Sequence, residues 1–186
     1  MARGLLISTG MNTVSHNHVD LAGERILGQP AAPVQLSVDA LDPRIDVLHQ
    51  LLADGLDLTS QVKQAHWTVR GPNFIAYHLL FDELAERLRA WNDEIAERCV
   101  TLAGTVHGTL RAAARSSALP DYPEEAMSGN GHVAALIVRY TAFAAALRAG
   151  LDEVSAHSGD AISQGLLAEI LRGVELDLWK LSSHVD

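Results

Sequence analysis

The stretch from Lys63 to Glu97 constrains the fold more than any other part of the sequence. It reads KQAHWTVRGPNFIAYHLLFDELAERLRAWNDEIAE, and Gly71-Pro72 interrupts an otherwise helical pattern. Apolar residues recur at three- and four-residue spacings on both sides of this dipeptide, which is the period of an amphipathic helix. Glycine and proline are the residues that most often end a helix. The stretch therefore predicts a helical hairpin that turns at Gly71-Pro72.

The two helices of this hairpin extend beyond the stretch itself. Asp42-Pro43 predicts the start of the first helix, because an aspartate can cap a helix whose first residue is proline. Gly104 is expected to close the second helix. The apolar residues of the first helix are separated by three or four positions, or by sums of these spacings. They are Ile45, Leu48, Leu52, Val62 and Val69. The stripe of the second helix comprises Phe74, Tyr77, Phe81, Leu84, Leu88, Trp91, Ile95, Cys99 and Leu102.

A second helical pair follows a long connection. The connection spans residues 104–130, is punctuated by proline and glycine, and contains a short helix predicted for Val106 to Ala114. Apolar periodicity then predicts one helix from Val133 to Val154 and another from about Ile162 to Leu181, on either side of Ser158-Gly159-Asp160. We find no strand-like alternation of any length. Two hairpins joined by one long crossover predict an all-α, ferritin-like four-helix bundle whose crossover contains a short helix.

The chain divides into a tail and one domain. Residues 1–40 are rich in glycine and proline and lack a sustained helical period, so we interpret them as a flexible tail. Residues 41–186 form the bundle domain. His16 and His18 of the tail have no acidic or cysteine neighbour, and we interpret them as an idle pair rather than a metal site.

Composition excludes several classes of function. The formal net charge is −9, and the bases include just two lysines, which argues against strong generic binding of nucleic acid. Apolar runs are far shorter than the roughly 20 residues of a membrane span, so no membrane partner is expected. Cys99 is the single cysteine, which rules out a disulfide within the chain and favours the cytoplasm.

Five polar residues of the central stretch fit a metal site. His66 lies six residues before Pro72 and His78 six residues after it, so an antiparallel hairpin brings the two imidazoles to the same height. At about 100° per residue, His78 shares one helix face with Asp82, Asp93 and Glu97. Asp82 and Asp93 are nevertheless about 16 Å apart along that helix at 1.5 Å per residue. One ion cannot bind both ends of this face within a single chain.

Two copies of the chain resolve this distance. If the second helices pack antiparallel about a twofold axis, His78 and Asp82 of one subunit face Asp93 and Glu97 of the other. Two equivalent sites result, each with two histidines and three carboxylates, and this donor set suits iron, manganese or zinc. Spacing alone leaves an alternative open, in which His66 and His78 are hydrogen-bonded core residues and Asp93 and Glu97 form a solvated face that pairs with arginines.

The same stretch resembles the Dps family, the bacterial mini-ferritins. The motif runs HW, then R-G-x-N-F, then H-x-x-x-D, then D-x-x-x-E-R at fixed spacings, and the resemblance extends from about Leu41 to His184. It implies a homododecameric cage that binds Fe(II) and oxidises it, with hydrogen peroxide preferred over dioxygen. The ferric mineral is stored inside, which protects DNA and the cell from oxidative damage.

The resemblance also implies which residues act. The ferroxidase centre of the family lies at the dimer interface, and the matching positions are His66, His78 and Asp82 of one subunit with Asp93 and Glu97 of its neighbour. Iron is the expected metal, with two sites per dimer interface, and zinc or manganese would compete for them. Trp67 matches a site-adjacent aromatic of the family and is either a trap for stray oxidising equivalents or a packing residue.

Two features depart from the family pattern. Dps proteins that condense DNA often carry a lysine-rich tail, whereas the tail of this chain has no lysine. The lysine-free tail therefore argues against DNA binding and against association with the nucleoid. Asp152, Glu153 and Asp160 are candidates for the acidic iron-entry pores, although an exposed helix end explains them equally well.

Two other functions compete with this one. A structural protein that coats DNA, with iron oxidation secondary, is the alternative, and the lysine-free tail weighs against it. A di-iron bundle with its site inside one subunit would need Glu-x-x-His motifs, and the chain contains none.

Overall fold

The computed structural model describes residues 42–123, 128–157 and 159–185. These residues form helices and no strand, which confirms the all-α class. The tail predicted for residues 1–40, with His16 and His18, lies outside them. The helices are α1 (Pro43–Thr68), α2 (Phe74–Thr101), α3 (Leu110–Ser116), α4 (Gly129–His157) and α5 (Ala161–Ser182).

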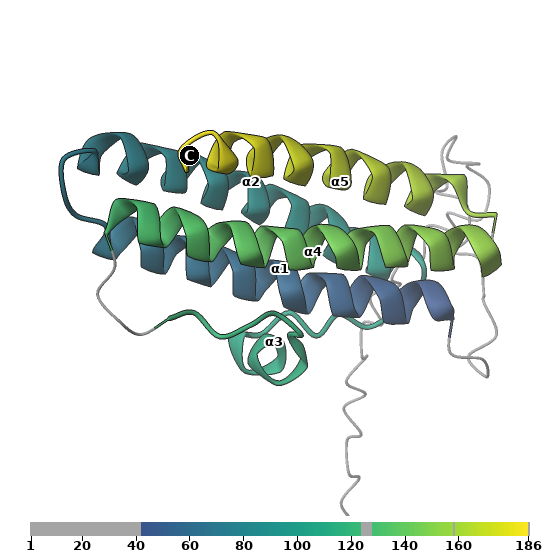
Figure 1. The fold of residues 1–186 in the computed structure, drawn as a ribbon. Helices are drawn as coiled ribbons and strands as arrows, with labels where there is room; N and C mark the ends of the chain where they lie inside the picture. Colours follow the sequence, from purple (N-terminus) through teal and green to yellow (C-terminus); the bar gives the residue numbers. More distant parts are fainter. Residues whose placement is uncertain (1–41, 124–127, 158, 186) are drawn as a thin grey trace, which may run out of the picture. The chain divides into compact units, whose positions relative to one another are not determined.

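Four long helices form the bundle, and the ribbon shows them lying side by side (Figure 1). Helix α1 packs against α2 and α4, and α5 packs against α4 and α2. The short helix α3 belongs to the crossover and lies outside the bundle against α1. Two hairpins joined by a long connection are thus present, as the sequence predicts, and the fold is ferritin-like.

The predicted start of the first hairpin is confirmed, but the end of α2 differs from expectation. The Asp42 side chain caps α1 by accepting a hydrogen bond from the Arg44 backbone N–H. At the other end, the left-handed residue is Ala103, with φ of 63°, and not Gly104. Gly104 is needed for close approach instead, because a Cβ there would lie 2.8 Å from Cys99 Sγ.

The crossover differs from the prediction in register. Its short helix begins at Leu110, where the Thr109 hydroxyl accepts from the Ala112 N–H, rather than near Val106. Helix α4 already begins at Gly129, which the sequence assigned to the connection. A Cβ at this position would lie 2.5 Å from the Tyr77 ring, so the glycine there serves close packing of the helix start rather than a turn.

Helix α4 contains a long apolar segment. By length and composition its segment Gly129–Ala156 could cross a membrane, but half of the apolar window is buried inside the bundle. Tyr140, Phe143 and Leu147 of this helix are fully buried in the core. Its apolar character is therefore accounted for by packing, and it is weak evidence for a membrane span.

Asp160 ties three helix ends together. Its carboxylate caps α5 by accepting from the Ile162 and Ser163 N–H groups, and it forms ion pairs with Arg44 at 3.1 Å and Arg98 at 2.7 Å. Partial burial alone would raise the pKa of Asp160, but hydrogen bonds from Ser163 and Arg98 outweigh it and hold that pKa well below its usual range. A structural role thus accounts for this pore candidate.

Replacing Asp160 with asparagine is expected to lower the free energy of unfolding by about 2 kcal/mol at neutral pH, through loss of the cap charge and the arginine pairs. The depressed pKa means that the ionised carboxylate stabilises the fold above the unfolded-state pKa of about 4, and that this contribution is lost as the pH falls toward the folded-state value. Urea titrations of wild type and Asp160→Asn should therefore differ most at neutral pH and converge below pH ~4. A constant difference across this range would contradict the prediction.

Candidate metal centre

Two histidines meet across the α1–α2 hairpin. His66 Nδ1 lies 2.8 Å from the His78 carbonyl oxygen, and His78 Nδ1 lies 2.9 Å from the His66 carbonyl oxygen. The two rings stack with their centroids 3.7 Å apart and an interplanar angle of 20°. A carbonyl can accept but not donate, so each Nδ1 carries the proton. The nitrogen left to bind a metal is therefore Nε2 of each ring.

Asp82 lies beside this pair and is held by Lys63. Its Oδ1 is 2.7 Å from Lys63 Nζ and 3.9 Å from His66 Nδ1. The hydrogen bond from Lys63 holds the pKa of Asp82 below its ordinary value. The carboxylate is therefore ionised at neutral pH and half exposed, so it can serve as a ligand once it is released from the ammonium group or through its second oxygen.

Lys63 is the site residue that the sequence reasoning missed. It precedes His66 by three positions, so both side chains lie on one helix face. Lysine is also rare in this chain, and that rarity was the signal available in the sequence.

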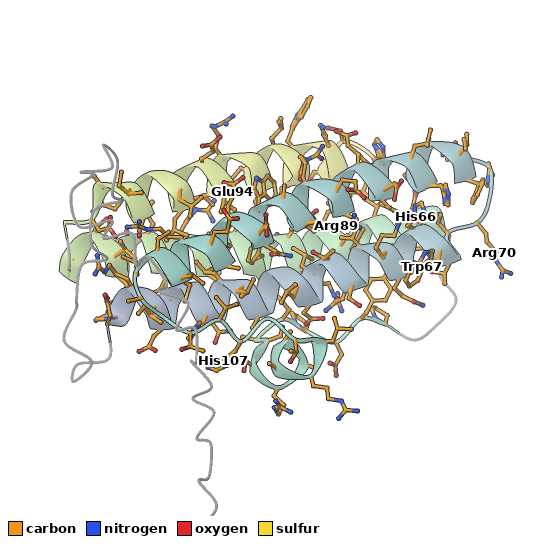
Figure 2. The ribbon with its side chains drawn as sticks, turned by 180° about the vertical axis from the view of Figure 1, so that it is seen from behind. His66, Trp67, Arg70, Arg89, Glu94 and His107 are labelled. Carbon is orange, nitrogen blue, oxygen red and sulfur yellow. The ribbon has the colours of Figure 1, made fainter. Side chains whose placement is uncertain are left out.

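Asp93 and Glu97 are exposed on α2 and remain separate from the histidines. Within the described part of the chain, no three histidine, cysteine, aspartate or glutamate side chains come close enough to hold one ion. Figure 2 shows His66 near the hairpin end of the bundle, with Arg89 and Glu94 farther along α2. One chain thus supplies two separated groups of candidate ligands.

Trp67 does not pack into the core of its own chain. Its side chain is 69% exposed, and Lys63 Nζ lies 6.0 Å from the ring centroid. Figure 2 places it next to His66, close to Arg70 at the hairpin end. The packing alternative is therefore not met within one subunit, and its oxidative role stays a prediction.

A groove runs beside the second group of ligands. It has a volume of about 560 Å³ and lies between α1, α2 and the crossover. Asp93 is in its lining, so this candidate ligand borders a hollow rather than a flat surface. The other lining residues are Leu52, Leu56, Glu86, Arg89, Ala90, Asn92, Ala96, Val106 and Gly108.

Comparison with known proteins identifies the family of the chain. The sequence model of the ferritin-like domain family matches residues 45–186 of this chain. The DNA protection during starvation protein of Agrobacterium fabrum is 38% identical over 141 residues, which cover 76% of this chain and 86% of that protein. The chain belongs to the Dps family.

Solved Dps structures share the fold. DpsA14 from Streptomyces coelicolor superposes with a TM-score of 0.73 at 32% identity, covering 77% of this chain and 84% of that one. The Dps of Microbacterium arborescens, in a structure described as its high iron form, superposes with a TM-score of 0.71 at 29% identity. The match covers 77% of this chain and 92% of that one. Dps homologues imply that this family member associates with itself.

Removing the Lys63 charge is expected to tighten binding of a divalent cation at the site that His66, His78 and Asp82 would form together with ligands of a second subunit. One positive charge at about 4 Å in a watery site opposes the ion by about 1 kcal/mol, so Lys63→Met should lower the Zn(II) dissociation constant about fivefold. Isothermal titration with Zn(II), which has no redox chemistry of its own, measures this affinity. Lys180→Met is the matched control, because Lys180 pairs with Glu83 instead. Equal affinities in the two variants would contradict the prediction.

Proposed function

We propose that this Dps-family protein is a ferroxidase and iron-storage protein that works as a cytoplasmic homododecamer. Fe(II) is its substrate, hydrogen peroxide its preferred oxidant over dioxygen, and ferric mineral its stored product. The carrying observation is the stacked pair of His66 and His78, whose Nδ1 atoms are engaged by backbone carbonyls, with Asp82 Oδ1 lying 3.9 Å from His66 Nδ1. The family membership supports the same conclusion.

The complete site would combine groups from two subunits. His66, His78 and Asp82 come from one subunit, and Asp93 and Glu97 come from the second. Each dimer would then hold two such sites, with two imidazoles and three carboxylates in each. No thiolate takes part, so the donor set suits iron, with zinc or manganese as competitors.

Each type of ligand has a distinct chemical task. Carboxylates are hard ligands and favour Fe(III), while the imidazoles keep the affinity moderate enough for iron to move on to the store. Two Fe(II) ions supply two electrons, which reduce one hydrogen peroxide to two water molecules with uptake of two protons. Both electrons are delivered at one paired site, so no hydroxyl radical is released.

The test is peroxide-driven oxidation of Fe(II) by a size-fractionated sample. We expect the assembled fraction to oxidise Fe(II) far faster than buffer and Asp82→Asn to lose most of that activity. Glu94→Gln is the matched control, because Glu94 is an exposed acid of α2 that lies off the ligand face. A sample that is monomeric, or that oxidises Fe(II) no faster than buffer, would overturn the proposal.

DNA binding is the second function to test, because curated relatives are named for DNA protection. Generic binding of DNA depends on clustered cations that displace counterions. This chain has a net charge of −9 and no lysine before Lys63. We therefore expect no retardation of duplex DNA in a gel-shift experiment at ~0.1 M salt, and robust condensation would establish the alternative.

A further inference from the structure

The candidate ligands on α2 form two pairs that are symmetric about the same point of the helix. His78 and Glu97 are equidistant in sequence from the midpoint between Arg87 and Leu88, and so are Asp82 and Asp93. In two antiparallel helices related by a twofold axis, residues equidistant from the axis face each other. Both ligand pairs therefore place the axis at one position, which fixes the register of the two helices.

We propose that Glu86 and Arg89 set the register in which helix α2 of one copy meets α2 of the second, through two reciprocal ion pairs across the axis. This inference rests on the shared iron site of the proposed function. It adds the residues that select the partner and align its ligands.

The charges beside the axis are self-complementary. Glu86 and Arg89 flank the same midpoint at equal distances, and the side chains of both are 61% exposed. Within one chain they form a pair at 2.9 Å. Across the axis, Glu86 of each copy would face Arg89 of the other, so a single pair of side chains supplies two intersubunit contacts.

Exposed apolar residues nearer both ends of α2 are also placed symmetrically about the proposed axis. Ile75 and Val100 are equidistant from the midpoint and are 61% and 58% exposed. Leu79, 61% exposed, is matched with the small Ala96, which lines the groove of about 560 Å³. The leucine of one copy thus meets a small residue and a hollow on the other.

All of these side chains lie on one side of α2. At about 100° per residue, they fall within roughly 100° of arc. A single contact face therefore carries the ligands, the charges and the apolar residues. These are Ile75, His78, Leu79, Asp82, Glu86, Arg89, Asp93, Ala96, Glu97 and Val100.

Charge reversal provides a test that does not depend on iron. In Glu86→Arg alone, or Arg89→Glu alone, like charges face each other twice, and the dissociation constant of the dimer should rise about tenfold. Co-expression of these two single variants should restore association, because each reversed charge then faces its opposite. Native mass spectrometry of metal-free protein measures the species formed, and circular dichroism confirms that each variant is helical.

The double variant Glu86→Arg/Arg89→Glu gives the sharper result. It keeps the pair within the chain and should associate with itself like wild type. Mixed with isotope-labelled wild type, it should sort into separate dimers, because like charges would meet at both contacts of a mixed dimer. Formation of mixed dimers in the statistical proportion would overturn the proposal.

Glu169 and Arg172 offer a matched control on α5. They are also a glutamate and an arginine three residues apart, and their side chains are 70% and 74% exposed. Their double reversal should mix freely with wild type. If association follows the charge pattern but the protein oxidises no Fe(II), the docking holds and the proposed function fails. If Fe(II) is oxidised while sorting is absent, the register proposal fails alone.

Discussion

Two variants, His78→Ala and Glu97→Ala, are each expected to lose ferroxidase activity about 100-fold and to recover part of it when their subunits are assembled together. A mixed dimer combines one site in which both groups are damaged with one site in which both are intact. With random pairing, half of the dimers are mixed, so about a quarter of all sites should work. The initial rate of peroxide-driven Fe(II) oxidation by the co-assembled sample measures this fraction.

The control for this recovery is a mixture of His78→Ala with Asp82→Asn. Both changes damage the same ligand group, so no pairing of these subunits restores an intact site. Native mass spectrometry establishes that mixed dimers have formed in each case. If co-assembled His78→Ala and Glu97→Ala subunits stay inactive, the shared site is wrong and each chain must bind iron in another way.

Removal of the Asp177 carboxylate is expected to cause the largest loss of stability. Asp177 is fully buried on α5, and Arg87 of α2 donates to it from Nε at 3.1 Å and from Nη2. Burial raises the pKa of Asp177, and the Arg87 charge opposes that rise. Asp177→Ala removes the buried partner of Arg87 and leaves it only the half-exposed Glu83, so the free energy of unfolding should fall by about 3 kcal/mol.

Chemical denaturation of the variants tests this prediction. Glu175→Ala is the control, because Glu175 lies on the same helix and pairs with Arg148 at the surface, and its loss should cost no more than about 0.5 kcal/mol. Replacing both members of the buried pair, as in Asp177→Leu with Arg87→Met, should be less damaging than Asp177→Ala alone. If the double replacement is the more damaging of the two, the pair stabilises the bundle more than its desolvation costs.

Periodicity predicted the long helices because each has one apolar stripe and clear end signals. Asp42 and Asp160 do begin α1 and α5 as caps. The glycines were interpreted less well, since Gly104 and Gly129 are required by contacts with Cys99 and Tyr77. Such contacts join residues that are distant in sequence or depend on exact packing, and local patterns do not contain that information.

At the candidate site, too, spacing along the sequence predicted some features and not others. The equal spacing of His66 and His78 about the turn predicted that they meet, and the structure brings them together. Neither Lys63 at Asp82 nor the buried position of Asp177 was foreseen. Each depends on which side chain of a neighbouring helix faces the carboxylate, and that is set by how α1, α2 and α5 pack.

By itself the sequence determined the helices, the hairpin at Gly71-Pro72 and the separation of Asp82 from Asp93, because helical rise and period follow from local backbone geometry. The tertiary structure decided which nitrogen of the two imidazoles is left for a metal, since each Nδ1 donates to a carbonyl of the other helix. It also decided which carboxylates are neutralised by lysine or arginine and which stay exposed. Those properties arise from atoms brought together by packing, and distances between helices are not encoded in the spacing along either one.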